Sequence, residues 1–207
     1  MTRVAVTGAI AAGKSTVLHW FAEWGAHSLS LDEIARTLSA PQGALWQAIV
    51  AEFGQGYLLP NGELNRRKLG QAVFADGTLR RRLNRISHPL ILQEMERRVE
   101  AIRQRQPGAI VAIEVPLLVE CALYPHFDRT VVVEAEEETR RARLLASGLS
   151  AEEVERRLGA QLSARVKRIF ADWVVWNQGT LEQARAHTWQ VWQELREEVA
   201  KYPVSVV

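Results

Sequence analysis

The sequence predicts an α/β fold in which helices flank a mostly parallel sheet. Short apolar runs alternate along the chain with longer segments of helical spacing, the order that parallel strands joined by crossover helices require. The run at 109–115 is apolar apart from Glu114, and the run at 129–133 ends in three valines, as expected for strands covered on both faces. The 207 residues match one domain of about 100–200 residues, so we expect a single domain over 1–207.

The first elements follow from the opening of the chain. Residues 4–7 form an apolar run that ends at Gly8, which indicates a buried strand followed by a turn. Apolar side chains at helical spacing then predict a helix over about 14–24. A second short strand is expected around 29–31, and Asp32 is expected to cap the helix after it.

The middle of the chain, residues 43–105, is predicted to be mostly helical. Breaks are expected at 54–56, 60–62 and 88–89, where Gly or Pro interrupts the helical spacing. The segment is rich in arginine, and most of these side chains are expected on solvated helix faces. They are Arg66, Arg67, Arg80, Arg81, Arg82, Arg85, Arg97 and Arg98.

The last part of the chain continues the alternation of strands and helices. After the two apolar strands named above, a charged helix is expected over 136–147, and Ser150 begins a capping box that opens another helix. Residues 173–176 predict the last strand. A second capping box at Thr180 opens a long final helix.

Composition and charge exclude several classes of protein. The formal net charge is only +2, whereas duplex-binding proteins usually carry a larger, clustered excess of base, so no nucleic-acid partner is expected. No apolar run reaches the roughly 18 residues of a membrane span. Cys121 is the sole cysteine, which excludes a disulfide within the chain, and the opening residues do not resemble a signal peptide. We therefore expect a cytoplasmic protein, with its oligomeric state left open.

A complete phosphate-loop motif follows the first predicted strand. Residues 8–16 match G-x-x-x-x-G-K-[ST] between a strand and a helix, which is the context that the motif requires. The two glycines permit a backbone that points successive N–H groups into the loop at the positive end of the helix. Lys14 would reach the β- and γ-phosphates of ATP, and the Ser15 hydroxyl would ligate Mg²⁺. The expected nucleotide-binding residues are Gly8, Ala11, Ala12, Gly13, Lys14, Ser15 and Thr16.

The motif predicts a nucleotide site and leaves the reaction open. A GTPase switch would need an Asn-Lys-x-Asp sequence to read guanine, and a transporter ATPase would need a Leu-Ser-Gly-Gly-Gln type signature; the sequence contains neither. A kinase needs arginines that hold the acceptor and arginines that close over the transferring phosphate, and the two arginine-rich helical regions suit this. A small-molecule kinase is therefore favoured over a nucleotide-binding regulatory module.

Further motifs resemble those of the dephospho-coenzyme A kinase family. They occur in order from residue 3 to about residue 195, and their combination is far more selective than the phosphate loop alone. The matching residues are Thr7 to Thr16, Asp32 to Arg36, Gly62 to Leu69 with Val73 and Phe74, His88 and Pro89, Pro116 to Glu120, Arg143, Gln161, and Asn177 to Gly179.

The resemblance implies a P-loop kinase-type parallel sheet flanked by helices, with a helical substrate-binding insert and a short lid over ATP. It places the core at about 1–40, 107–135 and 171–207, the insert at about 41–106, and the lid at about 136–170. It also implies a reaction in which ATP phosphorylates the ribose 3′-hydroxyl of dephospho-CoA to give CoA and ADP. A kinase for another acceptor, such as a nucleoside monophosphate or shikimate, is the alternative.

In addition to the loop glycines, the resemblance assigns roles to five residues. Asp32, Arg66 and His88 would bind the acceptor, and Asp32 would also accept the proton of the attacking hydroxyl. Lys14 and Arg143 would act on the transferring phosphate. The structural alternatives are a helix cap for Asp32, exposed helical charges for Arg66 and Arg143, and a structural role for His88.

The sequence departs from the family pattern at two of its sites. Ser30 stands where the family usually has the first acid of Asp-x-Asp, which leaves Asp32 as the sole carboxylate there. Ser147 stands where a further lid arginine is frequent. Asn177 lies just after the last predicted strand, where the resemblance places the edge of the adenine.

Overall fold

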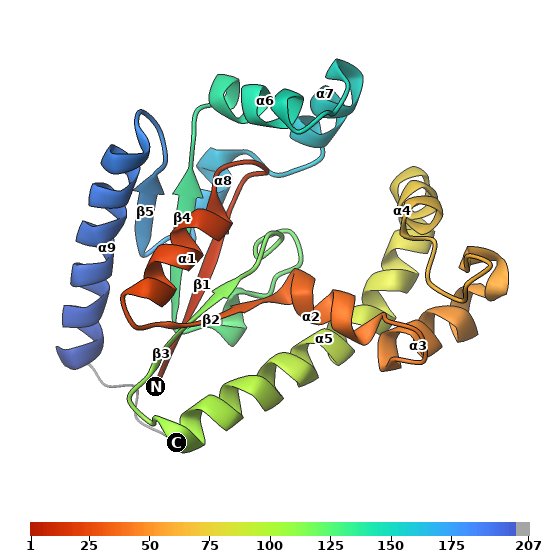
Figure 1. The fold of residues 1–207 in the computed structure, drawn as a ribbon, viewed down its shortest axis with the longest axis horizontal. Helices are drawn as coiled ribbons and strands as arrows, with labels where there is room; N and C mark the ends of the chain where they lie inside the picture. The colour runs from red at the N-terminus through yellow and green to blue at the C-terminus, as the bar shows by residue number, and fades with distance from the viewer. Residues whose placement is uncertain (202–207) are drawn as a thin grey trace. The chain divides into compact units, whose positions relative to one another are not determined.

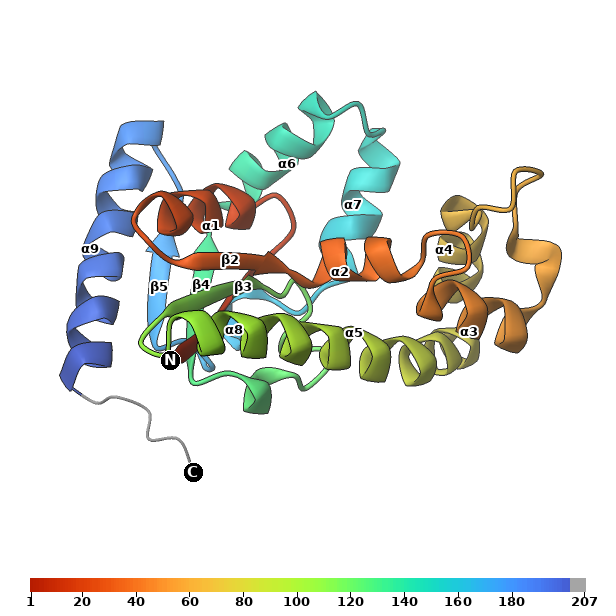
Figure 2. The same cartoon turned by 60° about the horizontal axis from the view of Figure 1, so that its bottom comes forward.

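A computed structural model describes residues 1–201 of the chain. The described chain divides into two compact units, the first formed by residues 1–29 and 102–201 and the second by Ser30–Ala101. Figures 1 and 2 show both units as ribbons. No helix within 1–201 is long and apolar enough to cross a membrane.

A five-stranded sheet in the order β2-β3-β1-β4-β5 organises the first unit. β1 lies between β3 and β4 and is parallel to both, and β4 is parallel to β5, so the predicted parallel sheet is confirmed. The middle strands are buried, with Val4, Val6 and Val131 fully inaccessible to solvent. The strands are β1 Thr2–Gly8, β2 His27–Ser30, β3 Ile110–Glu114, β4 Arg129–Glu134 and β5 Trp173–Trp176.

Helices α1 and α9 pack against each other and against the sheet (Figure 1). The Phe21 ring of α1 lies 5.2 Å from the Trp192 ring of α9, centroid to centroid, within the core that these helices share with the strands. The helices of this unit are α1 Lys14–Glu23, η2 Tyr124–His126, α6 Glu137–Ala146, α7 Ala151–Gly159, α8 Ala164–Arg168 and α9 Leu181–Lys201.

The second unit is helical and has its own apolar core of Leu45, Ile49, Leu64 and Leu69. The indole Nε1 of Trp46 donates to the carbonyl of Gly62 at 2.9 Å and ties α3 to the turn before α4. The helices of this unit are α2 Leu31–Leu38, α3 Ala44–Phe53, η1 Gln55–Tyr57, α4 Arg66–Ala75 and α5 Gly77–Arg105, whose last turn belongs to the first unit.

Two local predictions are wrong. The cap of α2 is Ser30, not Asp32: Ser30 is extended, its hydroxyl accepts the N–H of Glu33 at 3.4 Å, and the helix begins at Leu31. The expected break at residues 88–89 is absent, because α5 runs through Pro89 without ending. Apolar side chains on both sides of Pro89, Ile86 and Leu90 among them, pack on the core of the second unit, and this packing outweighs the hydrogen bond that proline removes.

Candidate active site

The phosphate loop joins β1 to α1, and its backbone explains the residue types of the motif. Gly8 and Gly13 have φ of 146° and 94°, and Ala11 has φ of 58°, so three loop residues are in the region that favours glycine. A Cβ at Gly8 would overlap the carbonyl oxygen of Val133, and a Cβ at Gly13 would overlap the side-chain amide of Asn177. Glycine is therefore favoured at both positions for two reasons: the backbone has a positive φ there, and a neighbouring atom lies where a Cβ would stand.

Lys14 is the first residue of α1, and its side chain folds back along the loop. Only 8% of this residue is exposed, and its Nζ donates to the carbonyl of Ala9 at 3.0 Å. The ammonium group is thus held over the loop, at the positive end of the helix, where an ATP phosphate would bind.

Arg143 and Asn177 also bind carbonyl groups of the loop. Arg143 on α6 donates from Nη1 to the carbonyl of Ala11 at 3.0 Å and from Nη2 to the carbonyl of Asn177 at 3.3 Å. Asn177, which follows β5 and is only 6% exposed, donates from Nδ2 to the carbonyl of Ala12 at 2.7 Å. Two residues that were singled out from separate parts of the sequence therefore meet at one loop.

Gln161 binds the loop through a backbone N–H group, whereas Lys14, Arg143 and Asn177 bind its carbonyl groups. It lies between α7 and α8, and its Oε1 accepts the N–H of Ile10 at 2.7 Å. The sequence marked Gln161 as a family match but gave it no role. No local signal could have done so, because the two partners lie 151 residues apart.

Ser15 and Thr16 occupy the first turn of α1, after Lys14. The Ser15 residue is exposed, so its hydroxyl can be reached by a ligand at the mouth of the loop. A hydroxyl oxygen is a hard ligand of the kind that Mg²⁺ prefers, and Mg²⁺ is usually bound by one or two protein oxygens together with substrate phosphates and water. The residue present therefore fits Mg²⁺ bound together with ATP.

A buried ion pair lies elsewhere in the first unit and was missed from the sequence. Lys167 on α8 is fully buried, and its Nζ lies 2.7 Å from Oε1 of Glu120, in the turn after β3. The same ammonium donates to the carbonyl of Pro116 at 3.4 Å, and Glu120 Oε1 accepts the N–H of Leu162 at 3.2 Å. These bonds attach the segment that contains Gln161 to the turn at the end of β3.

Asp32 lies in the first turn of α2, in the second unit, and is exposed. Glu33 is its acidic neighbour in the same turn, and both carboxylates lie near the positive end of the helix. With Ser30 acting as the cap, the carboxylate of Asp32 is not used to begin the helix.

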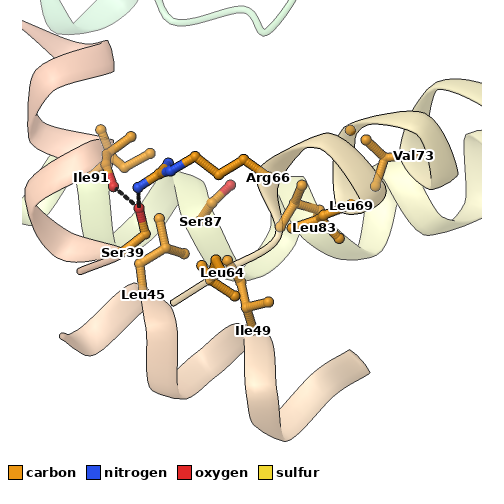
Figure 3. A pocket seen from close by; sticks show the side chains of 12 residues that line it. Ser39, Leu45, Ile49, Leu64, Arg66, Leu69, Val73, Leu83, Ser87 and Ile91 are labelled. Atoms are coloured by element: carbon orange, nitrogen blue, oxygen red, sulfur yellow. Dashed lines mark hydrogen bonds between the residues drawn. The ribbon is translucent and has the colours of Figure 1, made fainter. Parts of the chain in front are cut away.

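Arg66 and His88 also belong to the second unit. Arg66, the first residue of α4, donates from Nη2 to Oγ of Ser39 at 2.7 Å and to the carbonyl of Arg36 at 3.4 Å, which brings it beside the end of α2 (Figure 3). His88 is half-buried on α5, and burial lowers the pKa of its imidazole, which keeps the ring neutral near pH 7. The structure thus gathers Lys14, Arg143 and Asn177 at the loop of the first unit, and it places Asp32, Arg66 and His88 on three helices of the second.

Comparison with known proteins gives the family. A family profile described as dephospho-CoA kinase matches residues 2–183. A dephospho-CoA kinase of Symbiobacterium thermophilum is 41% identical over 194 residues, which cover 93% of this chain and 81% of that protein. One from Thermobifida fusca is also 41% identical, over 197 residues that cover 95% of this chain and 97% of that protein.

A solved structure agrees over nearly the same length. The crystal structure of TT1252 from Thermus thermophilus superposes with a TM-score of 0.79 at 32% identity, and the match covers 94% of this chain and 97% of that one. The profile match, the two relatives and this structure all extend over most of the chain. The chain therefore belongs to the dephospho-CoA kinase family.

Proposed function

We propose that this protein transfers the γ-phosphoryl group of ATP to the ribose 3′-hydroxyl of dephospho-CoA, giving CoA and ADP. The observation that carries the proposal is the phosphate loop, whose carbonyls at Ala9, Ala11 and Ala12 are held by three side chains. Family membership selects the acceptor over a nucleoside monophosphate or shikimate. A nucleotide-binding regulatory module would not need arginines on two helical regions.

In this proposal the first unit binds ATP. Backbone N–H groups of residues 8–16 bind the phosphates, and Lys14 and Arg143 stabilise the charge that develops on the transferring group. Asn177 lines the same site and is expected to lie at the adenine edge. Mg²⁺, held by Ser15 and the phosphates, would supply further neutralisation of charge. Residues 136–170 would form the lid over ATP, and the protein would act in the cytoplasm.

The second unit would bind the acceptor. Arg66 would pair with a phosphate of dephospho-CoA, and the neutral imidazole of His88 would accept or donate one hydrogen bond. Asp32 would orient the 3′-hydroxyl and accept its proton, because a ribose hydroxyl is a poor nucleophile at neutral pH.

The reaction is tested by a panel of acceptors with Mg²⁺ and ATP, in which release of ADP is measured. Dephospho-CoA should be used at least as well as any other compound. Clearly faster turnover of AMP, CMP, shikimate or gluconate would reject the assignment of the acceptor.

The role of Asp32 is tested against its neighbour. Asp32→Asn should lower the single-turnover rate of phosphoryl transfer by about 10²–10⁴-fold, with little change in ATP binding. Glu33→Gln is the matched control, since it removes a charge from the same helical turn. Equal rates in the two variants would show that the Asp32 carboxylate acts only as a negative charge at the N-terminus of α2.

A further inference from the structure

One peptide group of the phosphate loop, between Ala9 and Ile10, is hydrogen-bonded at both of its polar ends. Its carbonyl oxygen accepts the Lys14 ammonium at 3.0 Å and the N–H of Ala12 at 3.2 Å. Its N–H donates to Oε1 of Gln161 at 2.7 Å. Because a peptide group is planar, a rotation of this plane would break the bond to Gln161 together with the bond to Lys14. Gln161 therefore helps to fix the ammonium group through the peptide that both side chains bind.

The position of Gln161 depends in turn on a neighbouring contact. Gln161 lies between α7 and α8, in a segment that belongs to neither helix. The next residue, Leu162, donates its N–H to Oε1 of Glu120 at 3.2 Å, and the same oxygen lies 2.7 Å from the buried Lys167 ammonium. The segment is thus attached to a buried ion pair one residue away from the bond between Gln161 and Ile10.

The turn that carries Glu120 is itself attached to β1. Val115, the residue after β3, donates its N–H to the carbonyl of Val6 in β1 at 2.9 Å, and Leu118 in the turn is fully buried. β1 leads directly into the phosphate loop. The contacts therefore form a closed ring, which runs from β1 through Glu120 and Gln161 back to the loop. Both ends of the ring lie on one strand of the sheet, so the ring can fix the loop relative to that strand.

The ion pair also fixes the direction of the Glu120 carboxylate. The Lys167 ammonium and the Leu162 N–H both contact Oε1, whereas Oε2 is buried and has no hydrogen-bond partner among residues 1–201. A buried ion pair is a weak source of stability, because apolar side chains of similar volume often stabilise a fold equally well. The arrangement suits a second role, in which Lys167 holds one carboxylate oxygen toward the segment that contains Gln161.

We propose that Glu120 and Lys167 are positioning residues for ATP. The pair holds Gln161 on the Ile10 peptide, and this peptide holds the Lys14 ammonium at the place where the phosphates bind. The inference rests on the proposed function, since it takes ATP as the nucleotide, and it assigns no contact between the pair and a substrate. Because the pair acts through Gln161, its loss should weaken ATP binding no more than the loss of Gln161 does.

Two double variants remove the ion pair and differ in one hydrogen-bond acceptor. Lys167→Met/Glu120→Leu removes the acceptor of the Leu162 N–H, whereas Lys167→Met/Glu120→Gln keeps an amide oxygen there. Neither variant leaves a buried charge, so both should fold. In calorimetry with Mg²⁺ and ATP, the Leu variant should bind about fivefold more weakly, the loss expected for one hydrogen bond, and the Gln variant should stay within about twofold of the unmodified protein. Equal affinity in the two double variants would overturn the proposal.

A combined variant tests whether the pair acts through Gln161. Adding Gln161→Ala to Lys167→Met/Glu120→Leu should weaken ATP binding by less than about twofold more, because the contact that the pair supports is already lost. A loss of about 25-fold, the product of two independent effects, would show that the pair does not act through Gln161. Arg129→Met is the control for lowered stability. It breaks an ion pair with Glu198 at the opposite end of β4 from the loop and should leave the ATP affinity unchanged.

Hydrogen exchange tests the ring of contacts on the unmodified protein without nucleotide. One opening of the segment should expose the N–H groups of Ile10 and Leu162 together, so NMR should find the two amides protected to within about fivefold of each other. A larger difference would show that the two bonds open separately and would refute the positioning role. This measurement also decides the question if the Leu variant does not fold.

Failure of this proposal differs from failure of the proposed reaction. ATP affinity and amide exchange are both measured without an acceptor. If both follow the expected pattern while dephospho-CoA is not phosphorylated, the positioning role stands and the reaction is rejected. If dephospho-CoA is phosphorylated while the two double variants bind ATP equally, the reaction stands and the positioning role is rejected.

Discussion

Removing one partner of the buried Lys167–Glu120 pair should destabilise the protein strongly. Lys167 is fully buried and the Glu120 side chain is 18% exposed, so little water can replace the lost ammonium. Among the described residues, Oε2 of Glu120 is buried without a hydrogen-bond partner, and the carboxylate therefore depends on the contacts of Oε1. Lys167→Met keeps most of the side-chain volume and removes the charge. Loss of one partner of such a pair costs about 3–5 kcal/mol.

The expected loss is measured by urea unfolding and by the Tm. For a chain of this size, about 1 kcal/mol corresponds to ~2–4 °C, so the Tm of Lys167→Met should fall by about 6–20 °C. Lys167→Met/Glu120→Gln should regain most of the stability, because the amide oxygen can still accept the N–H of Leu162 and no charge is left buried. The reasoning is refuted if Lys167→Met loses less than about 1 kcal/mol, or if the double variant is no more stable than Lys167→Met.

Three further predictions concern the loop and the dependence of stability on pH. Lys14→Ala should lower turnover by about 10²–10³-fold or more in a steady-state assay, and near-normal turnover would place catalysis elsewhere. Gln161→Ala should weaken ATP binding by about fivefold, since one hydrogen bond worth about 1 kcal/mol no longer orients the Ile10 peptide; tighter binding by calorimetry would contradict this. Hydrogen bonds from Arg97 and Arg98 lower the pKa of Glu94 from 4.5 to about 2. Its contribution to stability is therefore present above pH 4.5 and is lost as the pH falls toward 2. The free energy of unfolding of Glu94→Gln, measured in urea, should change less over that window than that of the unmodified protein, and an equal change in both proteins would contradict the prediction.

Features that depend on neighbouring residues could be predicted from the sequence. The backbone of the phosphate loop, the strand over 173–176 and the capping box at Thr180 each need only a few adjacent residues, and the structure confirms all three. At Ser150 it shows the helix and one bond of the predicted box, from the N–H of Glu153 to the Ser150 hydroxyl. The parallel sheet followed from the alternation of elements, which the same short-range patterns define.

Features that depend on distant partners could not be predicted in the same way. Ser30 and Asp32 have similar capping chemistry, and only the point at which β2 ends decides which of them caps α2. Lys167 lies among basic residues and resembles an exposed charge until Glu120 is placed beside it. The roles of Asp32, Arg66 and His88 in binding the acceptor, and of Asp32 as the base, remain predictions that rest on the family resemblance.

The hydrogen bond from Asn177 to the Ala12 carbonyl also acts on the other end of that peptide group. The carbonyl of Ala12 and the N–H of Gly13 belong to one conjugated amide. A donor 2.7 Å from the oxygen draws electron density toward it, which leaves the N–H more positive and strengthens it as a donor by about 10–30%. In the proposed site, Asn177 would therefore act on a phosphate bound at the Gly13 N–H through the polarisation of a single peptide bond.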